Sequence, residues 1–192
     1  MNEIVSQNQA IQTARSGGQT VADVAAPQQY LTFQLSGEMF ALAILNVKEI
    51  IEYGNLTEIP MMPPFIRGVI NLRGAVVPVI DQTVRFGGQR SEVSKRTCIV
   101  IVEMKSGEEG RASQDIGIIV DAVSEVLEIP QGDIEPPPSF GAKIRADYIA
   151  GMGKVEGKFV IILNIDRVLS VEELTQLSQA AGSASSKAAA GD

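Results

Sequence analysis

The sequence predicts an all-β protein made of two small five-stranded barrels, with one helix near the C-terminus. Three observations predict this class. The chain contains about ten short runs that are apolar throughout or that alternate apolar and polar residues at the strand period. Glycine, proline and charged residues separate the runs, as is typical of turns. Two blocks of sequence also recur in the same order, and closing each set of strands into a barrel would remove open sheet edges.

The central block, residues 65–81, reads FIRGVINLRGAVVPVID and has the signature of a β-hairpin. Arg73 and Gly74 separate its two apolar runs. Gly74 can take a positive φ at no steric cost, so the Arg73 side chain is expected to project from the turn. Residues 148–164, YIAGMGKVEGKFVIILN, repeat the pattern at an offset of 83, because 151 − 68 and 157 − 74 are both 83.

A second block recurs upstream. FALAILNVKEIIE at residues 40–52 resembles IGIIVDAVSEVLE at residues 116–128, with an offset of 76 (123 − 47 and 125 − 49). Any two strand–turn–strand segments would align in part, since turn glycines recur in all β-proteins. The recurrence of two separate blocks in one order favours internal duplication instead. The symmetry is imperfect, because Arg73 corresponds to Glu156 in the second copy.

The other elements follow from local patterns. The strands are expected to begin at Tyr30, where YLTFQL alternates at the strand period. Residues 81–86 predict a short helical turn with Asp81 as its N-cap. Residues 97–103 form a nearly continuous apolar run and predict a strand buried on both faces. Ser170, with a glutamate three residues later, fits a capping box for the C-terminal helix.

These elements divide the chain into five predicted parts. They are a disordered N-terminal tail at 1–27, a first β-barrel subdomain at 28–95, a second β-barrel subdomain at 96–169, a C-terminal helix at 170–181 and a mobile tail at 182–192.

Composition excludes several kinds of function. The 192 residues carry a net charge of −7 and no histidine. The acidic balance argues against non-specific nucleic-acid binding, and the missing histidine excludes a Ser-His-Asp triad and histidine metal ligands. No cofactor or metal is expected. Cys98 is the single cysteine and is interpreted as a small buried hydrophobe. No stretch approaches the ~18 apolar residues of a membrane span, so neither export nor insertion is expected.

Glu49 and Arg73 are the polar residues that most suggest a site. A surface ion pair contributes only ~0 to 1 kcal/mol to folding, so stability gives little reason for such a pair. An arginine presented at a turn beside the apolar residues Val47 and Ile50 suits a protein–protein interface, where arginine is enriched. From the residues alone, a plain surface ion pair and an interface pair remain open.

The motifs GVINLRGAVVPVID, FALAILNVKEI and GIIVDAVSEVLEIP, in this order, closely resemble the chemotaxis coupling protein family, the CheW family. The resemblance runs from about Tyr30 to Leu169 and leaves out both tails. It implies two intertwined barrels of the SH3-like type and a non-enzymatic adaptor. By resemblance, its partners are the cytoplasmic tip of methyl-accepting chemoreceptors and the regulatory domain of the chemotaxis histidine kinase. A cytoplasmic location, with recruitment to membrane receptor arrays through these partners, is also implied.

The resemblance also implies where the partners bind. A helical receptor tip is expected in an apolar groove between the barrels, and Glu49 and Arg73 match a charged pair linked to coupling in the family. Kinase contacts are expected at the barrel ends and can be assigned only by region. The groove is expected to be lined by Leu31, Ile44, Val47, Ile50 and Val123.

Two alternatives remain open at this point. The adaptor could serve a related surface-motility or second-messenger pathway, because the motifs do not discriminate between pathways. A small-ligand-binding double barrel is a different class of function, since clefts between modules often hold ligands. Convergent polar groups in the cleft would favour a ligand, whereas an apolar strip would favour a partner helix.

Overall fold

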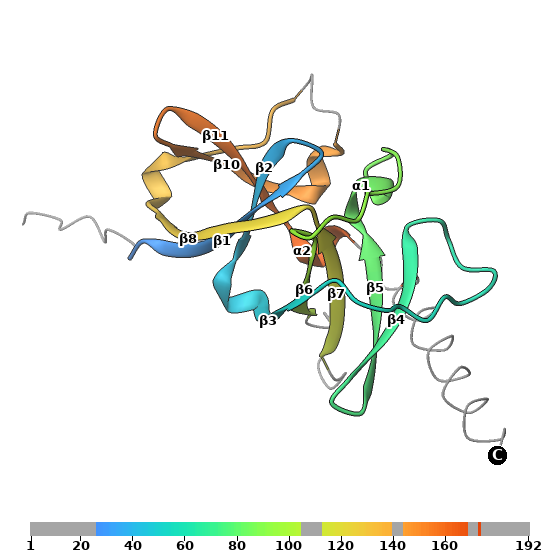
Figure 1. Ribbon diagram of the computed structural model, residues 1–192. Coiled ribbons are helices and arrows are strands. Elements are labelled where there is room, and N and C mark those ends of the chain that lie inside the picture. Colours follow the sequence, from blue (N-terminus) through green and yellow to red (C-terminus); the bar gives the residue numbers. More distant parts are fainter. Residues whose placement is uncertain (1–25, 105–112, 140–143, 169–172, 174–192) are drawn as a thin grey trace, which may run out of the picture.

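The computed structural model describes residues 26–104, 113–139, 144–168 and 173, and these form an all-β protein of two sheets (Figure 1). The helix expected at 170–181 and both tails lie outside the described residues, apart from Glu173 and residues 26 and 27. Short helical segments interrupt the strands: η1 (Ile44–Asn46), α1 (Gln82–Arg85), η2 (Gln131–Asp133), η3 (Ala146–Tyr148) and α2 (Ile165–Val168). The predicted all-β class is confirmed.

The first sheet has six strands in the order β8-β1-β2-β11-β10-β9. These are β1 (Gln28–Leu35), β2 (Glu38–Ala43), β8 (Ala122–Ile129), β9 (Ile134–Glu135), β10 (Ile149–Val155) and β11 (Lys158–Leu163). The second sheet has five strands in the order β3-β6-β7-β5-β4. These are β3 (Val47–Glu52), β4 (Ile66–Leu72), β5 (Ala75–Asp81), β6 (Cys98–Met104) and β7 (Gln114–Val120). Strand β6 is the predicted buried strand, and four successive residues in it, 99–102, are fully buried.

Strand pairing confirms the internal duplication. The β4–β5 hairpin pairs Ile66 with Ile80, and the β10–β11 hairpin pairs Ile149 with Leu163, which are the same positions shifted by 83. Both hairpins break register at the same place, one residue further along the first strand. At both turns a non-glycine residue and the following glycine have positive φ values, which is the geometry of a type I′ turn. The parallel pairs β5–β7 and β11–β2 are also equivalent, at offsets of 83 and 76.

The two copies exchange strands, and this corrects the predicted subdomains. The boundary at residues 95 and 96 separates the two sequence repeats but not the two sheets. Strands β6 and β7 of the second repeat pair within the sheet that holds β3, β4 and β5 of the first, while β1 and β2 pair between β8 and β11. Each sheet therefore combines the first two strands of one repeat, β1 and β2 or β6 and β7, with the later strands of the other repeat, so the copies are intertwined.

The core has three parts that reflect this exchange. One cluster, which includes Tyr30 and Ile162, belongs to the first sheet, and a second, which includes Val79 and Ile99, belongs to the second sheet. The largest cluster is shared, because it joins Phe33 of β1 with residues of β6 and β7. Each sheet buries apolar surface against the other in this cluster. The two sheets therefore stabilise each other, since the free energy of burial scales with the area removed from water.

Gly68 offers a test of how tightly β4 is packed. It has a φ of 148°, and a Cβ built there would lie 2.4 Å from the carbonyl oxygen of Thr57, a backbone atom. At the equivalent Gly151 the nearest atom, at 2.6 Å, is the Cγ2 methyl carbon of the Ile134 side chain, and the nearest backbone atom, the carbonyl oxygen of Glu135, is 3.1 Å away. We expect Gly68→Ala to lower the free energy of unfolding by about 1–3 kcal/mol and Gly151→Ala by less, because a side chain can move and a paired backbone cannot. Urea denaturation of both variants measures the difference, and equal losses would contradict the packing argument.

Candidate functional site

The structure brings the predicted pair Glu49 and Arg73 into contact. A guanidinium nitrogen of Arg73 lies 3.0 Å from a carboxylate oxygen of Glu49, and Arg73 comes from the β4–β5 turn while Glu49 lies on β3. Arg73 has a φ of 52°, and the backbone N–H of Gly74 donates to the side chain of Asn71 at 2.9 Å, so the turn itself is well fixed. The Arg73 side chain is 80% exposed. Its guanidinium is therefore presented to solvent from a rigid support.

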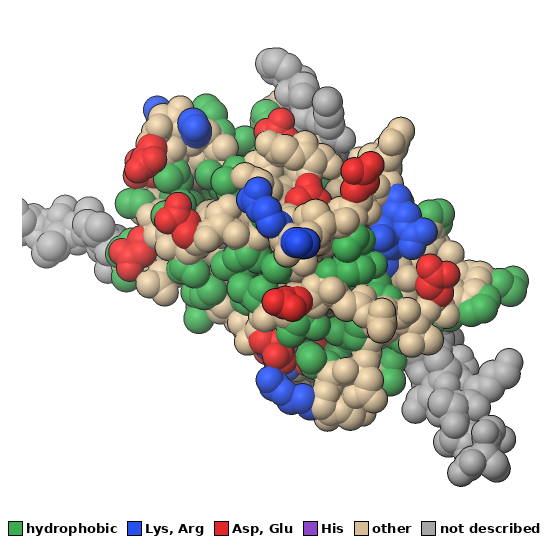
Figure 2. Space-filling model, in the orientation of Figure 1, with side chains coloured by type: hydrophobic (Ala, Val, Ile, Leu, Met, Phe, Trp, Pro, Cys, Tyr) green, Lys and Arg blue, Asp and Glu red, His purple; other side chains and the backbone are tan. Residues whose placement is uncertain are grey.

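Beside this pair lies an exposed apolar surface between the two sheets. Ile44, Val47 and Val123 are half-buried and pack against the same shared core cluster, although they come from η1, β3 and β8. Val47 and Val123 are equivalent residues of the two repeats (123 − 47 = 76), as are Ile50 and Val126. We call the surface formed by Ile44, Leu45, Val47, Ile50, Val123 and Val126 the seam. Figure 2 shows hydrophobic surface between β8 and β3, bordered by acidic side chains.

The residues expected to line the groove differ in how far they are exposed to solvent. Ile50 is 43% exposed, and Leu31 is only 2% exposed. Leu31 points into the shared core cluster, so the prediction that it lines the groove is corrected. Two exposed residues of the seam were not predicted from the sequence, Leu45 at 84% exposed and Val126 at 48%. The duplication offset could have identified Val126, because it lies 76 residues after Ile50.

The charges around the seam differ between the two repeats. Lys48 lies between Asp115 at 2.7 Å and Glu103 at 3.4 Å. The hydrogen bond that the Lys48 ammonium donates to the Asp115 carboxylate raises the pKa of the ammonium above its ordinary value, so Lys48 stays charged. Its equivalent on β8 is the neutral Ser124, which is exposed. Both strands carry glutamates at matching positions, Glu49 and Glu52 on β3 and Glu125 and Glu128 on β8. The β3 half of the seam differs because it also carries the cations Lys48 and Arg73, whose equivalents are Ser124 and Glu156.

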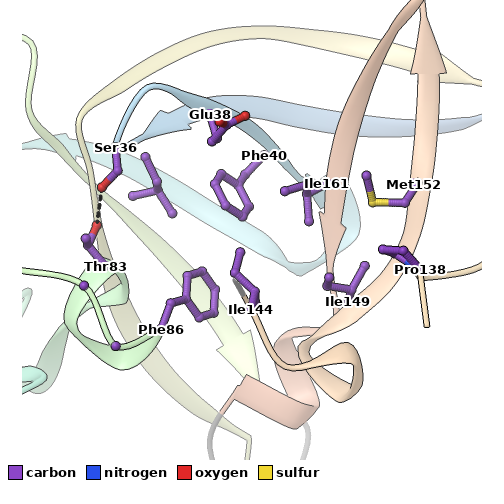
Figure 3. Close-up of a pocket in the computed structure, with 13 residues that line it drawn as sticks. Ser36, Glu38, Phe40, Thr83, Phe86, Pro138, Ile144, Ile149, Met152 and Ile161 are labelled. Carbon is purple, nitrogen blue, oxygen red and sulfur yellow. Dashed lines mark hydrogen bonds between the residues drawn. The ribbon is translucent and has the colours of Figure 1, made fainter. Parts of the chain in front are cut away.

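A separate pocket of about 920 Å³ opens beside β2 and β11 (Figure 3). In Figure 3 the side chains of Phe40, Phe86, Ile144 and Ile149 surround its interior, and Ser36 contacts Thr83 at one side. Its lining is mainly apolar, and none of the residues expected in the groove is part of it. Among the lining residues the polar side chains are Ser36, Glu38 and Thr83. The convergent polar groups that would favour a small ligand are therefore sparse in this pocket.

Neither a metal centre nor a membrane-spanning helix is found among the residues that the structure describes. Within them, no group of three or more Asp, Glu and Cys side chains is placed to hold a metal ion. No helix in the same part of the chain is long and apolar enough to cross a membrane.

The strand exchange and the seam define a class of duplicated, all-β proteins with two intertwined sheets. Within this class, the chain belongs to the CheW-like family, because residues 29–173 match the CheW-like domain. The chemotaxis protein CheW of Klebsiella aerogenes is 33% identical over 170 residues, which cover 88% of this chain and 95% of that protein. Protein FrzA of Myxococcus xanthus is 29% identical over 144 residues, covering 74% of this chain and 85% of the relative.

A solved structure gives the same result for the fold. The scaffolding protein TtCheW of Thermoanaerobacter tengcongensis superposes with a TM-score of 0.67 at 38% sequence identity, covering 77% of this chain and 90% of that chain. The chain is therefore similar in sequence to proteins named for chemotaxis and similar in structure to a scaffolding protein.

Proposed function

We propose that this protein is a non-enzymatic adaptor that couples methyl-accepting chemoreceptors to the chemotaxis histidine kinase in signalling arrays. The observation that carries the proposal is the seam, an apolar surface with exposed Leu45, Ile50 and Val126 next to the Arg73–Glu49 pair. Exposed apolar residues with charges at the rim suit recognition of an amphipathic helix. The apolar face supplies affinity, and the rim charges set the orientation and the rate of association.

The partners follow from the family. The cytoplasmic tip of a receptor is helical and would lie along the seam, while the regulatory domain of the kinase would contact the ends of the two sheets. The protein would act in the cytoplasm and reach the membrane arrays through these partners. Each contact would be modest, and an array that links many such contacts would multiply their effective strength. The same geometry would serve a coupling protein of a surface-motility or second-messenger pathway.

The charged pair gives the direct test of this proposal. A receptor cytoplasmic fragment is titrated with the purified protein and with Arg73→Glu, and binding is followed by fluorescence anisotropy. We expect Arg73→Glu to weaken binding by about three- to tenfold, because it places two like charges, Glu49 and the new carboxylate, at the rim of the seam. The melting temperature should not change, because an exposed ion pair contributes little to stability.

Arg90→Glu is the matched control. Arg90 also forms an exposed ion pair, with Glu58 at 3.5 Å, but lies in the segment between α1 and β6. Binding by Arg90→Glu should equal that of the unmodified protein. If Arg73→Glu binds the receptor fragment as well as Arg90→Glu does, the pair has no part in recognition. If the unmodified protein binds neither the fragment nor the kinase regulatory domain in a pull-down, the proposed adaptor function is wrong.

A further inference from the structure

Arg85 lies between two aromatic rings that are equivalent in the duplication. Its guanidinium carbon is 4.7 Å from the centre of the Phe65 ring and 5.5 Å from the centre of the Tyr148 ring. Phe65 precedes β4 and Tyr148 precedes β10, and the two residues are 83 apart. A cation over an aromatic face is attracted by the ring, more strongly where water is excluded. One cation therefore holds one ring from each repeat.

The hydrogen bonds of Arg85 also join the repeats. Its Nε donates to the backbone carbonyl of Val168 at 2.9 Å, and Val168 is the equivalent of Arg85 itself, since 168 − 85 is 83. Helix α1 (Gln82–Arg85) and helix α2 (Ile165–Val168) thus meet through matching positions. Two nitrogens of the guanidinium also contact the two carboxylate oxygens of Glu173, each at 2.8 Å. Such two-pronged pairing is a property of guanidinium that an ammonium lacks.

Contacts between equivalent residues place Arg85 at the axis that relates the two repeats. Space at such an axis admits one copy of a large charged group, because two guanidinium groups there would repel each other. The chain satisfies this requirement with arginine at 85 and valine at 168. The Arg85 side chain is only 16% exposed, so its contacts form in surroundings where electrostatic interactions are weakly screened.

We propose that Arg85 is a positioning residue that fixes the two repeats relative to each other and thereby sets the geometry of the seam. Val47 and Val123 are another equivalent pair, and both pack on the core cluster that the two sheets share. Of the two rings that hold Arg85, Tyr148 belongs to the same cluster and Phe65 packs against it. A change in how the repeats meet at Arg85 is therefore transmitted to the seam through one continuous packed core. The effect on partner binding rests on the proposed function, whereas the effect on repeat geometry does not.

The test measures a distance within the protein, without a partner. In a Cys98→Ser background, cysteines replace Glu52 of β3 and Glu128 of β8, which are exposed and equivalent, and both are spin-labelled. Pulsed electron paramagnetic resonance then gives the distribution of distances between the labels. We expect Arg85→Met to widen this distribution about twofold, because the two repeats lose their shared cation. Arg85→Lys keeps the charge over the rings but cannot make the two-pronged pair, and should give an intermediate width.

Arg145→Met is the control. Arg145 also stacks on Tyr148, at 5.2 Å, but pairs with Asp147 of the same repeat. Its removal should leave the distribution unchanged. An unchanged distribution in folded Arg85→Met overturns the inference, and if that variant does not fold, an unchanged distribution in Arg85→Lys overturns it equally.

A binding titration with the receptor fragment separates this inference from the proposed function. Binding that weakens about fivefold in Arg85→Met and less in Arg85→Lys, in variants that remain folded, supports transmission to the seam. A widened distance distribution in a protein that binds no receptor fragment supports the positioning role and counts against the adaptor proposal. A normal distribution in a protein that binds counts against the positioning role alone.

Discussion

Arg67→Met is expected to lower the free energy of unfolding by about 3–5 kcal/mol, because it leaves the carboxylate of Asp81 buried without its cation. The Arg67 side chain is 7% exposed and Asp81 is 0% exposed, and a guanidinium nitrogen lies 2.8 Å from a carboxylate oxygen. Removing a partner from such a pair costs far more than the pair contributes, since the remaining charge keeps its full desolvation penalty.

Asp81 also accepts hydrogen bonds from other segments, so the loss of stability should extend beyond β4 and β5. It accepts hydrogen bonds from the backbone N–H of Ser91 at 2.9 Å and from the Ser91 hydroxyl at 2.8 Å. It also accepts from the backbone N–H of Val84, as the N-cap of α1. The carboxylate thus ties β4, α1 and the segment that leads to β6 to one point. Disturbing it should therefore destabilise all three segments together.

Urea denaturation followed by circular dichroism measures the effect. Arg90→Met is the matched control, because Arg90 forms an exposed pair with Glu58, and it should cost less than about 1 kcal/mol. The double variant Arg67→Met/Asp81→Leu should recover part of the loss, because no buried charge remains unpaired. A loss below about 1 kcal/mol for Arg67→Met alone would mean that water reaches Asp81 and that the pair is not buried in solution.

The contrast between Asp81 and Arg67 illustrates how far sequence reasoning reaches. Asp81 was predicted as an N-cap because the signal is local: a carboxylate immediately before a short helical pattern. Its pairing with Arg67 could not be predicted, because a single arginine within an apolar strand reads equally well as an exposed side chain. Burial of both groups depends on the segment after α1 folding back so that Ser91 reaches Asp81.

The strand exchange is a second feature that could not be predicted from the sequence. The offsets of 83 and 76 identify which residues are equivalent, and the matching registers of the two hairpins confirm them. Equivalence does not say whether β3 pairs with strands of its own repeat or with β6, since both arrangements would bury the same apolar faces. Strand β1 shows a third limit. The alternation places Leu31, Phe33 and Leu35 on one face, and all three are buried in the shared core cluster, so the pattern itself favoured a core position for Leu31 and the groove assignment rested on the resemblance alone. The alternation did not predict the burial of Thr32 on the opposite face.

The largest expected effect on binding comes from placing carboxylates on both halves of the seam. The variant Ile50→Asp/Val126→Asp changes two equivalent residues that are 43% and 48% exposed. A partner helix lying along the seam would bury both carboxylates without a cation, which opposes binding strongly. We expect affinity for the receptor fragment to fall by at least about thirtyfold, corresponding to about 2 kcal/mol, the threshold of an interface hot spot.

Val93→Asp is the control for this variant, because Val93 is 51% exposed but lies between α1 and β6, away from the seam. The melting temperatures of both variants should stay close to that of the unmodified protein, because exposed side chains contribute little to the core. Anisotropy titrations with the receptor fragment then compare the two. A seam variant that binds as well as Val93→Asp would place the receptor elsewhere on the molecule, and the apolar pocket beside β2 and β11 would be the next surface to substitute. If the seam variant stays folded and is the only one of the two to lose binding, the partner contacts the surface formed by β3 and β8. These are the edge strands that the strand exchange brings together.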